Sequence, residues 1–242
     1  MLVAVLGVLI LKLAAGTQLG QHPLLAPAGN LDAGFYLQFA QRVAAGDVLL
    51  LDPASYQGQP PAAFFISPLY IYALALFLKV GGSIAAVRVL QLVLGTLAVW
   101  LMVLTARRWW GDRAGWAALV LAAGCGLFTF YETLILQAAL DPLLTALDLY
   151  LLTRAAQDGR ARSWAAAGAA LGLHALNRPN MVLVLAGLAA AIFLRRPGHA
   201  SFSPSGPNEP NRRHPAAPTP VRPRAARSRL RMTSLGEDWV RS

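Results

Sequence analysis

Long apolar runs that carry almost no charge most strongly constrain the fold of this chain. Residues 87–106 and 179–194 together contain one ionisable side chain, that of Arg88. A helix needs about 20 apolar residues to cross the roughly 30 Å hydrocarbon core of a bilayer. Charged residues make up 13% of the 242 residues, whereas a soluble domain has about 25%. The sequence therefore predicts an all-α, polytopic bundle of transmembrane helices.

Six spans are predicted from these runs, at residues 1–16, 84–106, 114–131, 133–153, 164–176 and 179–194. Residues 1–16 also resemble a signal peptide, but Lys12 interrupts the apolar stretch and several spans follow, so a short first span is preferred. The thirteen residues of segment 68–80 reach only about 20 Å as a helix. That segment is predicted to lie at the outer surface.

The charge distribution predicts the topology. The chain has a net charge of +10, and linkers 107–113 and 154–162 carry three arginines each. The positive-inside rule places both linkers in the cytoplasm and the loop 17–83 outside. No basic helix with interleaved aromatic residues appears, so a nucleic acid is not an expected partner.

The first outer loop contains a second predicted surface helix, at residues 31–45. Asn30 is its expected N-cap and Gly46 its expected stop. Asp32 begins this helix, and Tyr36 lies one turn later on the same face. A carboxylate at a helix N-terminus is stabilised in its charged form and can act as a general base. The residue pattern alone favours a simple first-turn or capping acid.

Four other ionisable residues near the expected outer face are candidates for chemistry. Glu132 and Asp141 flank the outer end of span 133–153. Asp141-Pro142 resembles a helix start, and the alternative is a continuous helix with a kink at Pro142. Arg88 and Arg178 lie on the side where the positive-inside rule disfavours cations. Each either binds an anion such as a lipid phosphate or extends to the headgroups.

Motifs for cofactors are absent from the sequence. No CxxC, HExxH, GxGxxG or P-loop occurs, and the chain has one cysteine, Cys125. No cofactor is therefore expected, while the question of a divalent metal stays open. Asp148 and His174 are expected to pair or pack inside the bundle.

The sequence changes character at Pro197. Residues 197–242 contain eight prolines and eight arginines and show almost no apolar periodicity, so this second region is predicted to be a disordered tail. It is either a basic cytoplasmic tail or an out-of-frame end to a longer gene, and the second explanation is slightly favoured.

Five short motifs follow one another in an order that resembles the GT-C membrane glycosyltransferases. The nearest branch is the protein O-mannosyltransferase and aminoarabinose transferase group, which includes dolichyl-phosphate-mannose-protein mannosyltransferase-like proteins. The resemblance covers residues 1–196. The motifs are Asp32-x-x-x-Tyr36, Ser67-Pro68-Leu69-Tyr70, Arg88-Val-Leu-Gln91, Tyr131-Glu132 with Leu140-Asp141, and Asn177-Arg178-Pro179-Asn180.

The resemblance implies transfer of a sugar from a polyprenyl-phosphate donor to a protein or glycolipid acceptor. It implies a bacterial inner-membrane protein with its active face in the periplasm or outside the cell. Asp32 matches the catalytic acid of the family's first loop. Asp141 matches its second outer acid, and Arg178 falls where a cation often lies near the carrier phosphate. Tyr36, Arg88 and Glu132 complete the expected substrate-binding set.

Two departures from the family pattern leave alternatives open. The family often has Asp-Glu where this chain has Asp32-Ala33, and its members continue for several more spans. The chain is therefore interpreted as C-terminally truncated. One alternative is an inactive remnant or scaffold of such an enzyme. The other is a transporter-like bundle, which would be expected to contain inverted repeats.

Overall fold

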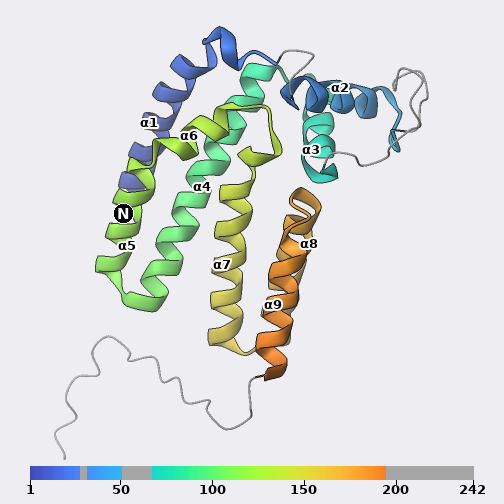
Figure 1. Cartoon of the computed structure of the whole chain (residues 1–242). Helices are drawn as coiled ribbons and strands as arrows, with labels where there is room; N and C mark the ends of the chain where they lie inside the picture. The colour runs from blue at the N-terminus through green and yellow to red at the C-terminus, as the bar shows by residue number, and fades with distance from the viewer. Residues whose placement is uncertain (28–31, 51–66, 195–242) are drawn as a thin grey trace, which may run out of the picture. The chain divides into compact units, whose positions relative to one another are not determined.

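The structure, a computed structural model, describes residues 1–27, 32–50 and 67–194 (Figure 1). All of them belong to one compact unit, Met1–Pro204. Within these ranges the chain is helical and has no strand, which confirms the predicted all-α class. The helices are α1 (Leu2–Gly20), α2 (Asp32–Ala45), α3 (Pro68–Lys79), α4 (Ile84–Trp110), α5 (Asp112–Gly124), α6 (Gly126–Thr133), α7 (Asp141–Asp158), α8 (Ala161–Asn177) and α9 (Met181–Leu194), with short 3-10 turns η1 (Pro23–Leu25) and η3 (Gln137–Ala139).

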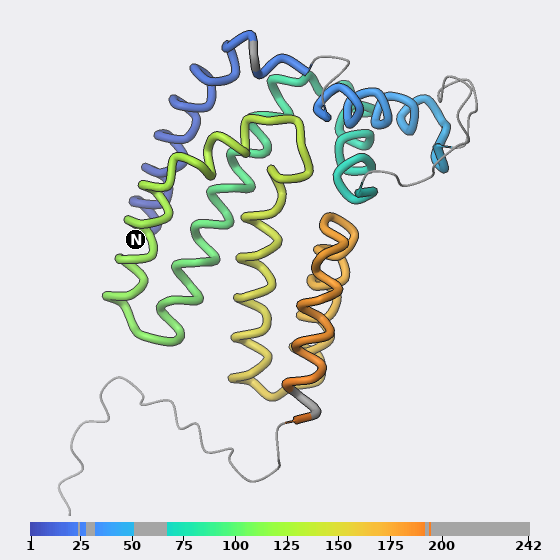
Figure 2. Tube along the Cα trace, viewed as in Figure 1, coloured from blue at the N-terminus to red at the C-terminus, as the bar shows by residue number. Residues whose placement is uncertain are grey.

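Helix α4 is the central element, and α1, α5, α6 and α7 all pack against it (Figure 2). On one side, Val99 and Val103 of α4 meet Val5 and Leu119. On another, Ala98 of α4 and Ala146 of α7 are almost completely buried. Small residues at such a contact let two membrane helices approach closely. The bundle is therefore held by close packing around α4.

Two described helices, α1 and α4, are long and apolar enough to cross a membrane. Helices α5 and α6 are bent by 54° at Cys125, and they add a third span if the bent pair is counted as one. The predicted span at 114–131 therefore corresponds to two helices joined at a bend. Cys125 lies between two glycines, which are poor helix formers, so a break is permitted at this position. The other helices lie in the same bundle, and the count of six spans stays a prediction.

The predicted span 133–153 begins later than expected. Residues 134–140 form an irregular connection with η3, and α7 begins at Asp141 with Pro142 in its first turn. Proline suits that position because its missing N–H would have no intrahelical partner there. Of the two alternatives at this dipeptide, the helix start is the correct one.

Several helix ends also differ from the prediction. Helix α1 extends to Gly20, into the predicted loop. Arg107 and Arg108 belong to the last turn of α4, so Gly111 alone separates α4 from α5. The α4–α5 and α7–α8 connections lie at one end of the bundle, and α2 and α3 lie at the other (Figure 1). The arginine-rich segments therefore share one end, as the positive-inside argument requires.

Helices α2 and α3 pack against each other at the end of the bundle opposite the arginine-rich connections (Figure 1). Their contact buries Tyr36 and Ala40 of α2 and Tyr70, Ile71 and Leu74 of α3. The described residues confirm that both predicted segments are helical, α3 with twelve residues and α2 from Asp32 onward, while their place at the outer surface stays a prediction. The expected N-cap Asn30 and the tail 197–242 lie outside the described residues.

Candidate functional site

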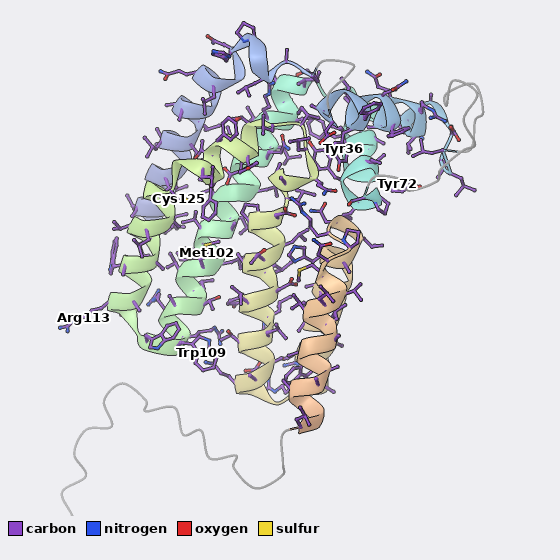
Figure 3. The ribbon with its side chains drawn as sticks, in the orientation of Figure 1. Tyr36, Tyr72, Met102, Trp109, Arg113 and Cys125 are labelled. Carbon is purple, nitrogen blue, oxygen red and sulfur yellow. The ribbon has the colours of Figure 1, made fainter. Side chains whose placement is uncertain are left out.

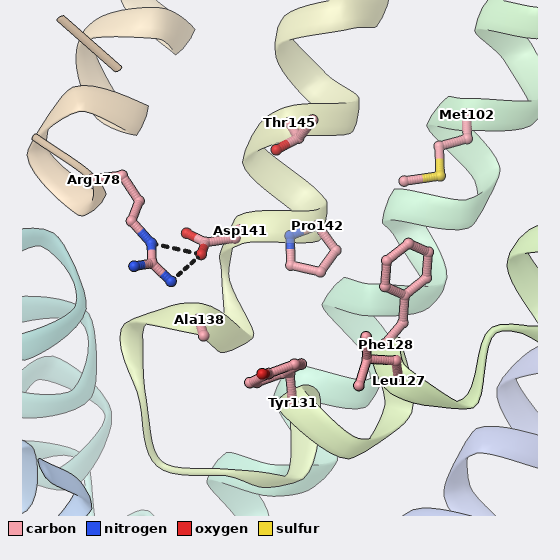
Figure 4. A pocket seen from close by; sticks show the side chains of 9 residues that line it. All are labelled: Met102, Leu127, Phe128, Tyr131, Ala138, Asp141, Pro142, Thr145 and Arg178. Atoms are coloured by element: carbon pink, nitrogen blue, oxygen red, sulfur yellow. Dashed lines mark hydrogen bonds and ion pairs between the residues drawn. The ribbon is translucent and has the colours of Figure 1, made fainter. Parts of the chain in front are cut away.

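An ion pair joins the first residue of α7 to the residue that follows α8. Arg178 follows the last residue of α8, and its Nε and Nη2 lie 2.7 Å and 2.6 Å from Oδ2 of Asp141, the first residue of α7 (Figure 4). Asn177 donates from Nδ2 to the other oxygen of the Asp141 carboxylate at 2.7 Å. The hydrogen bond to Asp141 raises the pKa of Arg178 above its ordinary value. These hydrogen bonds fix the positions of both charged side chains, which remain partly exposed.

Tyr36 connects α2 to this ion pair through Gln137. The Tyr36 Oη and the Gln137 side-chain amide are 2.8 Å apart. When that amide is turned so that both ends are matched, its nitrogen donates to Tyr36 and its oxygen accepts from Arg178 Nη1 at 3.3 Å. Tyr36 is 4% exposed. Burial and the nearby charges of Asp32 and Asp141 raise its pKa to about 12, although Arg178 acts in the opposite direction.

Asp32 is the first residue of α2 and is exposed. Its charge acts on Tyr36, as do the charges of Asp141 and Arg178. Tyr36 is therefore within electrostatic reach of three other residues predicted from the sequence, Asp32, Asp141 and Arg178. They come from α2, α7 and the α8–α9 connection, which are far apart in the sequence.

A cavity of about 360 Å³ lies beside the ion pair. Asp141 and Arg178 form its charged end, and Tyr131 and Thr145 add polar atoms (Figure 4). The remaining wall consists of Met102, Leu127, Phe128, Ala138 and Pro142. A cavity with a charged end and an apolar wall suits a ligand that has an anionic head and an apolar chain.

Sequence reasoning missed most of this wall. Tyr131 belongs to the Tyr131-Glu132 motif, but the sequence pattern does not show that its ring lines a cavity. Met102 and Phe128 lie in apolar runs, where a residue that lines a cavity has the same pattern as one that faces lipid. The contact between Gln137 and Tyr36 joins residues 101 positions apart, and the local sequence carried no signal for it.

Arg88 has three backbone partners. Its guanidinium donates to the carbonyl oxygens of Gly20 at 2.8 Å, Leu25 at 2.6 Å and Thr133 at 3.0 Å. These residues are the last of α1, η1 and α6. A cation at a helix C-terminus satisfies free carbonyls and is favoured by the helix dipole. Arg88 thus fixes the C-terminal ends of three helical elements.

Glu132 is completely buried and pairs with Lys12 of α1. The Lys12 Nζ lies 2.6 Å and 2.7 Å from the two carboxylate oxygens. Glu132 is not among the residues that line the cavity beside Arg178. The structure therefore places Arg88 and Glu132 in contacts that hold α6 in position, apart from the Asp141–Arg178 pair.

Asp148 and His174, each expected to pair or pack inside the bundle, contact each other. Nδ1 of His174 lies 2.6 Å from Oδ2 of Asp148, and both side chains are buried between α7 and α8. Residues 1–27, 32–50 and 67–194 contain no group of three or more His, Cys, Asp or Glu side chains arranged to hold a metal ion.

Comparison with known proteins gives one family match. The family described as dolichyl-phosphate-mannose-protein mannosyltransferase matches residues 61–205. The match includes Arg88, Glu132, Asp141 and Arg178, and it begins after Asp32 and Tyr36. No curated protein and no solved structure matches the chain.

Proposed function

This chain belongs to the dolichyl-phosphate-mannose-protein mannosyltransferase family, and from that premise we propose that it transfers a sugar from a polyprenyl-phosphate carrier. Family membership supports a membrane glycosyltransferase of the GT-C type. In this proposal the donor is a polyprenyl-phosphate sugar and the acceptor is a protein or a glycolipid. The active face lies on the non-cytoplasmic side of a bacterial inner membrane.

The cavity beside Arg178 is the observation that carries the proposal. Its charged end suits the carrier phosphate, and its wall of Met102, Leu127 and Phe128 suits the first isoprene units. A guanidinium binds phosphate through charge-assisted, often bidentate hydrogen bonds. Asp141 and Gln137 keep the Arg178 side chain oriented toward this end of the cavity.

The proposed reaction breaks the bond between the sugar C1 and the carrier phosphate oxygen. Asp32 takes the proton from the acceptor hydroxyl, whose oxygen forms the new bond to C1 from the opposite face, so the configuration inverts. The departing polyprenyl phosphate gains negative charge, which Arg178 stabilises. Preorganised donors that point at developing charge give a large share of the rate enhancement in many enzymes.

Tyr36 has a supporting place in this proposal. Because its pKa is raised to about 12, it stays a neutral hydroxyl at physiological pH and can donate a hydrogen bond near Arg178. Arg88 and Glu132 contribute through the scaffold, since their polar atoms contact helix-end carbonyls and Lys12. Neither is needed at the reacting atoms.

The test is sugar transfer by membranes that contain the full chain. Labelled polyprenyl-phosphate sugars serve as donors, with protein and glycolipid acceptors tried in turn. We expect Asp32→Asn to lower the rate by about 10²–10⁴-fold, the usual contribution of a positioned general base. Asparagine has nearly the same size as aspartate and still accepts hydrogen bonds, and Asp32 is exposed, so the variant should stay folded.

Asp112→Asn is the matched control. Asp112 is an exposed first-turn acid of α5, at the opposite end of the bundle from Asp32 (Figure 1). Its substitution should leave the rate unchanged. If Asp32→Asn retains most of the activity, Asp32 is only a first-turn acid and Asp141 becomes the leading base. If the wild type is inactive with every donor, a non-catalytic scaffold becomes the better explanation.

A further inference from the structure

A second cavity, of about 580 Å³, lies at the arginine-rich end of the bundle. It is bounded by α4, α7, α8 and α9, and its wall is largely apolar. Three tryptophans line it, together with aliphatic residues and two threonines. The lining residues are Thr105, Trp109, Trp110, Leu149, Leu152, Thr153, Ala156, Trp164, Leu188 and Ala191.

The position of the tryptophans indicates the depth of this cavity. Trp109 donates from its indole nitrogen to Thr153 at 2.8 Å, while Trp110 is 74% exposed. Tryptophan is enriched at the level of the lipid headgroups, where one part of the ring is in apolar surroundings and the other is wet. The cavity thus extends from the headgroup level toward the hydrocarbon core.

Positive charge surrounds the same end. Segments 107–113 and 154–162 contain six arginines and two aspartates, Asp112 and Asp158. The aspartates pair with Arg107 and Arg154, which leaves a net excess of positive charge. A basic pocket at the cytoplasmic end of a bundle typically binds anionic lipid headgroups.

Arg108, in the last turn of α4, and Arg160, which precedes α8, lie at the same end of the bundle as this cavity. Arg108 directly precedes Trp109 and contacts Gln157, the neighbour of the lining residue Ala156. Its guanidinium also lies 5.3 Å from the Tyr150 ring centre, and no carboxylate in the described part of the chain forms an ion pair with it. Arg160 is exposed and immediately precedes α8, which carries Trp164.

We propose that this cavity binds an anionic phospholipid. One acyl chain occupies the tryptophan-lined space, and the headgroup phosphate binds Arg108 and Arg160. The apolar wall provides most of the contact area, and the two guanidiniums select for negative charge. This site lies at the opposite end of the bundle from the Asp141–Arg178 cavity (Figure 3 labels Trp109 and Tyr36 near the two ends), and it does not depend on the proposed transfer reaction.

The test uses the purified full chain in detergent, mixed with equal amounts of phosphatidylglycerol and phosphatidylcholine. Native mass spectrometry counts the bound lipid, and quenching of tryptophan fluorescence by chain-brominated phosphatidylglycerol reports an acyl chain near the indoles. We expect a phosphatidylglycerol adduct and strong quenching. Each arginine near a membrane surface contributes about a fivefold change in affinity for anionic lipid. The double variant Arg108→Gln/Arg160→Gln should therefore lose most of the preference.

Two further variants separate charge from shape. Ala156→Phe fills the cavity without changing charge, and it should reduce quenching with either lipid. Arg113→Gln removes an exposed arginine on the α5 side of the bundle, away from the cavity (Figure 3), and should change nothing. Gel filtration confirms that each variant is folded.

Three results would overturn the proposal. The first is equal binding of both lipids by the wild type. The second is quenching that Ala156→Phe leaves unchanged. The third is a preference for phosphatidylglycerol that falls equally with Arg113→Gln and with the double variant, because that would show a diffuse surface charge and no site.

Discussion

Lys12 of α1 and Glu132 of α6, which are 120 residues apart in the sequence, form a buried ion pair. Their side chains are 4% and 0% exposed. In the sequence Lys12 interrupts an apolar run, and in the structure it neutralises the only buried glutamate of the described residues. The pair fastens α1 to α6, whose last residue is also held by Arg88.

Removing one partner of this pair should be costly. Lys12→Met leaves the Glu132 carboxylate buried and unpaired, and breaking a buried ion pair in this way typically costs about 3–5 kcal/mol. The melting temperature in detergent should fall sharply. The double variant Lys12→Met/Glu132→Leu should recover most of the loss, since an apolar replacement of both partners is often neutral. Additive losses in the double variant would show that the two residues do not act as a pair.

Gly95 should be sensitive to even a small side chain. A Cβ at this position of α4 would overlap the Glu132 carboxylate, so Gly95→Ala should displace the ion pair and lower thermal stability. Gly7→Ala in α1 is the matched control, because no atom lies within 4 Å of a Cβ built there. Alanine is favoured over glycine in a helix by up to about 1 kcal/mol, so the control should be neutral or stabilising. An equal change in thermal stability for Gly95→Ala and Gly7→Ala would contradict the close contact between Gly95 and the Glu132 carboxylate.

Arg178 should be needed for transfer more than for folding. Arg178→Gln removes both the charge and the paired donors, and the loss of a preorganised donor typically lowers the rate by about 10²–10³-fold. Arg178→Lys keeps the charge and should retain part of the activity. Rates at saturating and limiting donor concentrations measure the effect, with Arg113→Gln as control. A wild-type rate in Arg178→Gln would exclude Arg178 from binding the phosphate.

Tyr36 should make stability depend on pH under alkaline conditions. Burial raises its pKa from an ordinary value near 10 to about 12, so the folded state binds the phenol proton more tightly than the unfolded state. The resulting stabilisation is fully present below about pH 10 and is lost as the pH rises toward 12. Melting temperatures of wild type and Tyr36→Phe between pH 8 and 12 should converge as pH increases. Parallel curves would contradict this assignment.

The topology can be tested with introduced cysteines in a Cys125→Ala background. Gln38 in α2 and Ala161 at the start of α8 are both exposed and lie at opposite ends of the bundle (Figure 1). A membrane-impermeant maleimide should label Gln38→Cys in intact cells and Ala161→Cys only after permeabilisation, since the arginine-rich end is expected inside. The reverse pattern would place the proposed catalytic face in the cytoplasm.

The local sequence pattern predicted most of the helices of this fold. Apolar runs predicted the helices of the bundle, and Ser67-Pro68 marked the start of α3. Asp141-Pro142 correctly indicated a helix start, although the span itself was predicted to begin at residue 133. The bend at Cys125 was missed, because a pair of flanking glycines permits a break without requiring one, and packing against α1 and α4 decides it.

The sequence by itself determined that this chain is a helical membrane protein, which end carries the arginines, and which acids and cations lie near the other end. These properties follow from composition and from the period of a helix, which are local. Only the tertiary structure decided which group each charged side chain contacts. Arg178 pairs with Asp141, Arg88 donates to three helix-end carbonyls, and Glu132 pairs with Lys12. Each choice depends on which helix faces which across the bundle, and that is fixed by the summed packing of many side chains.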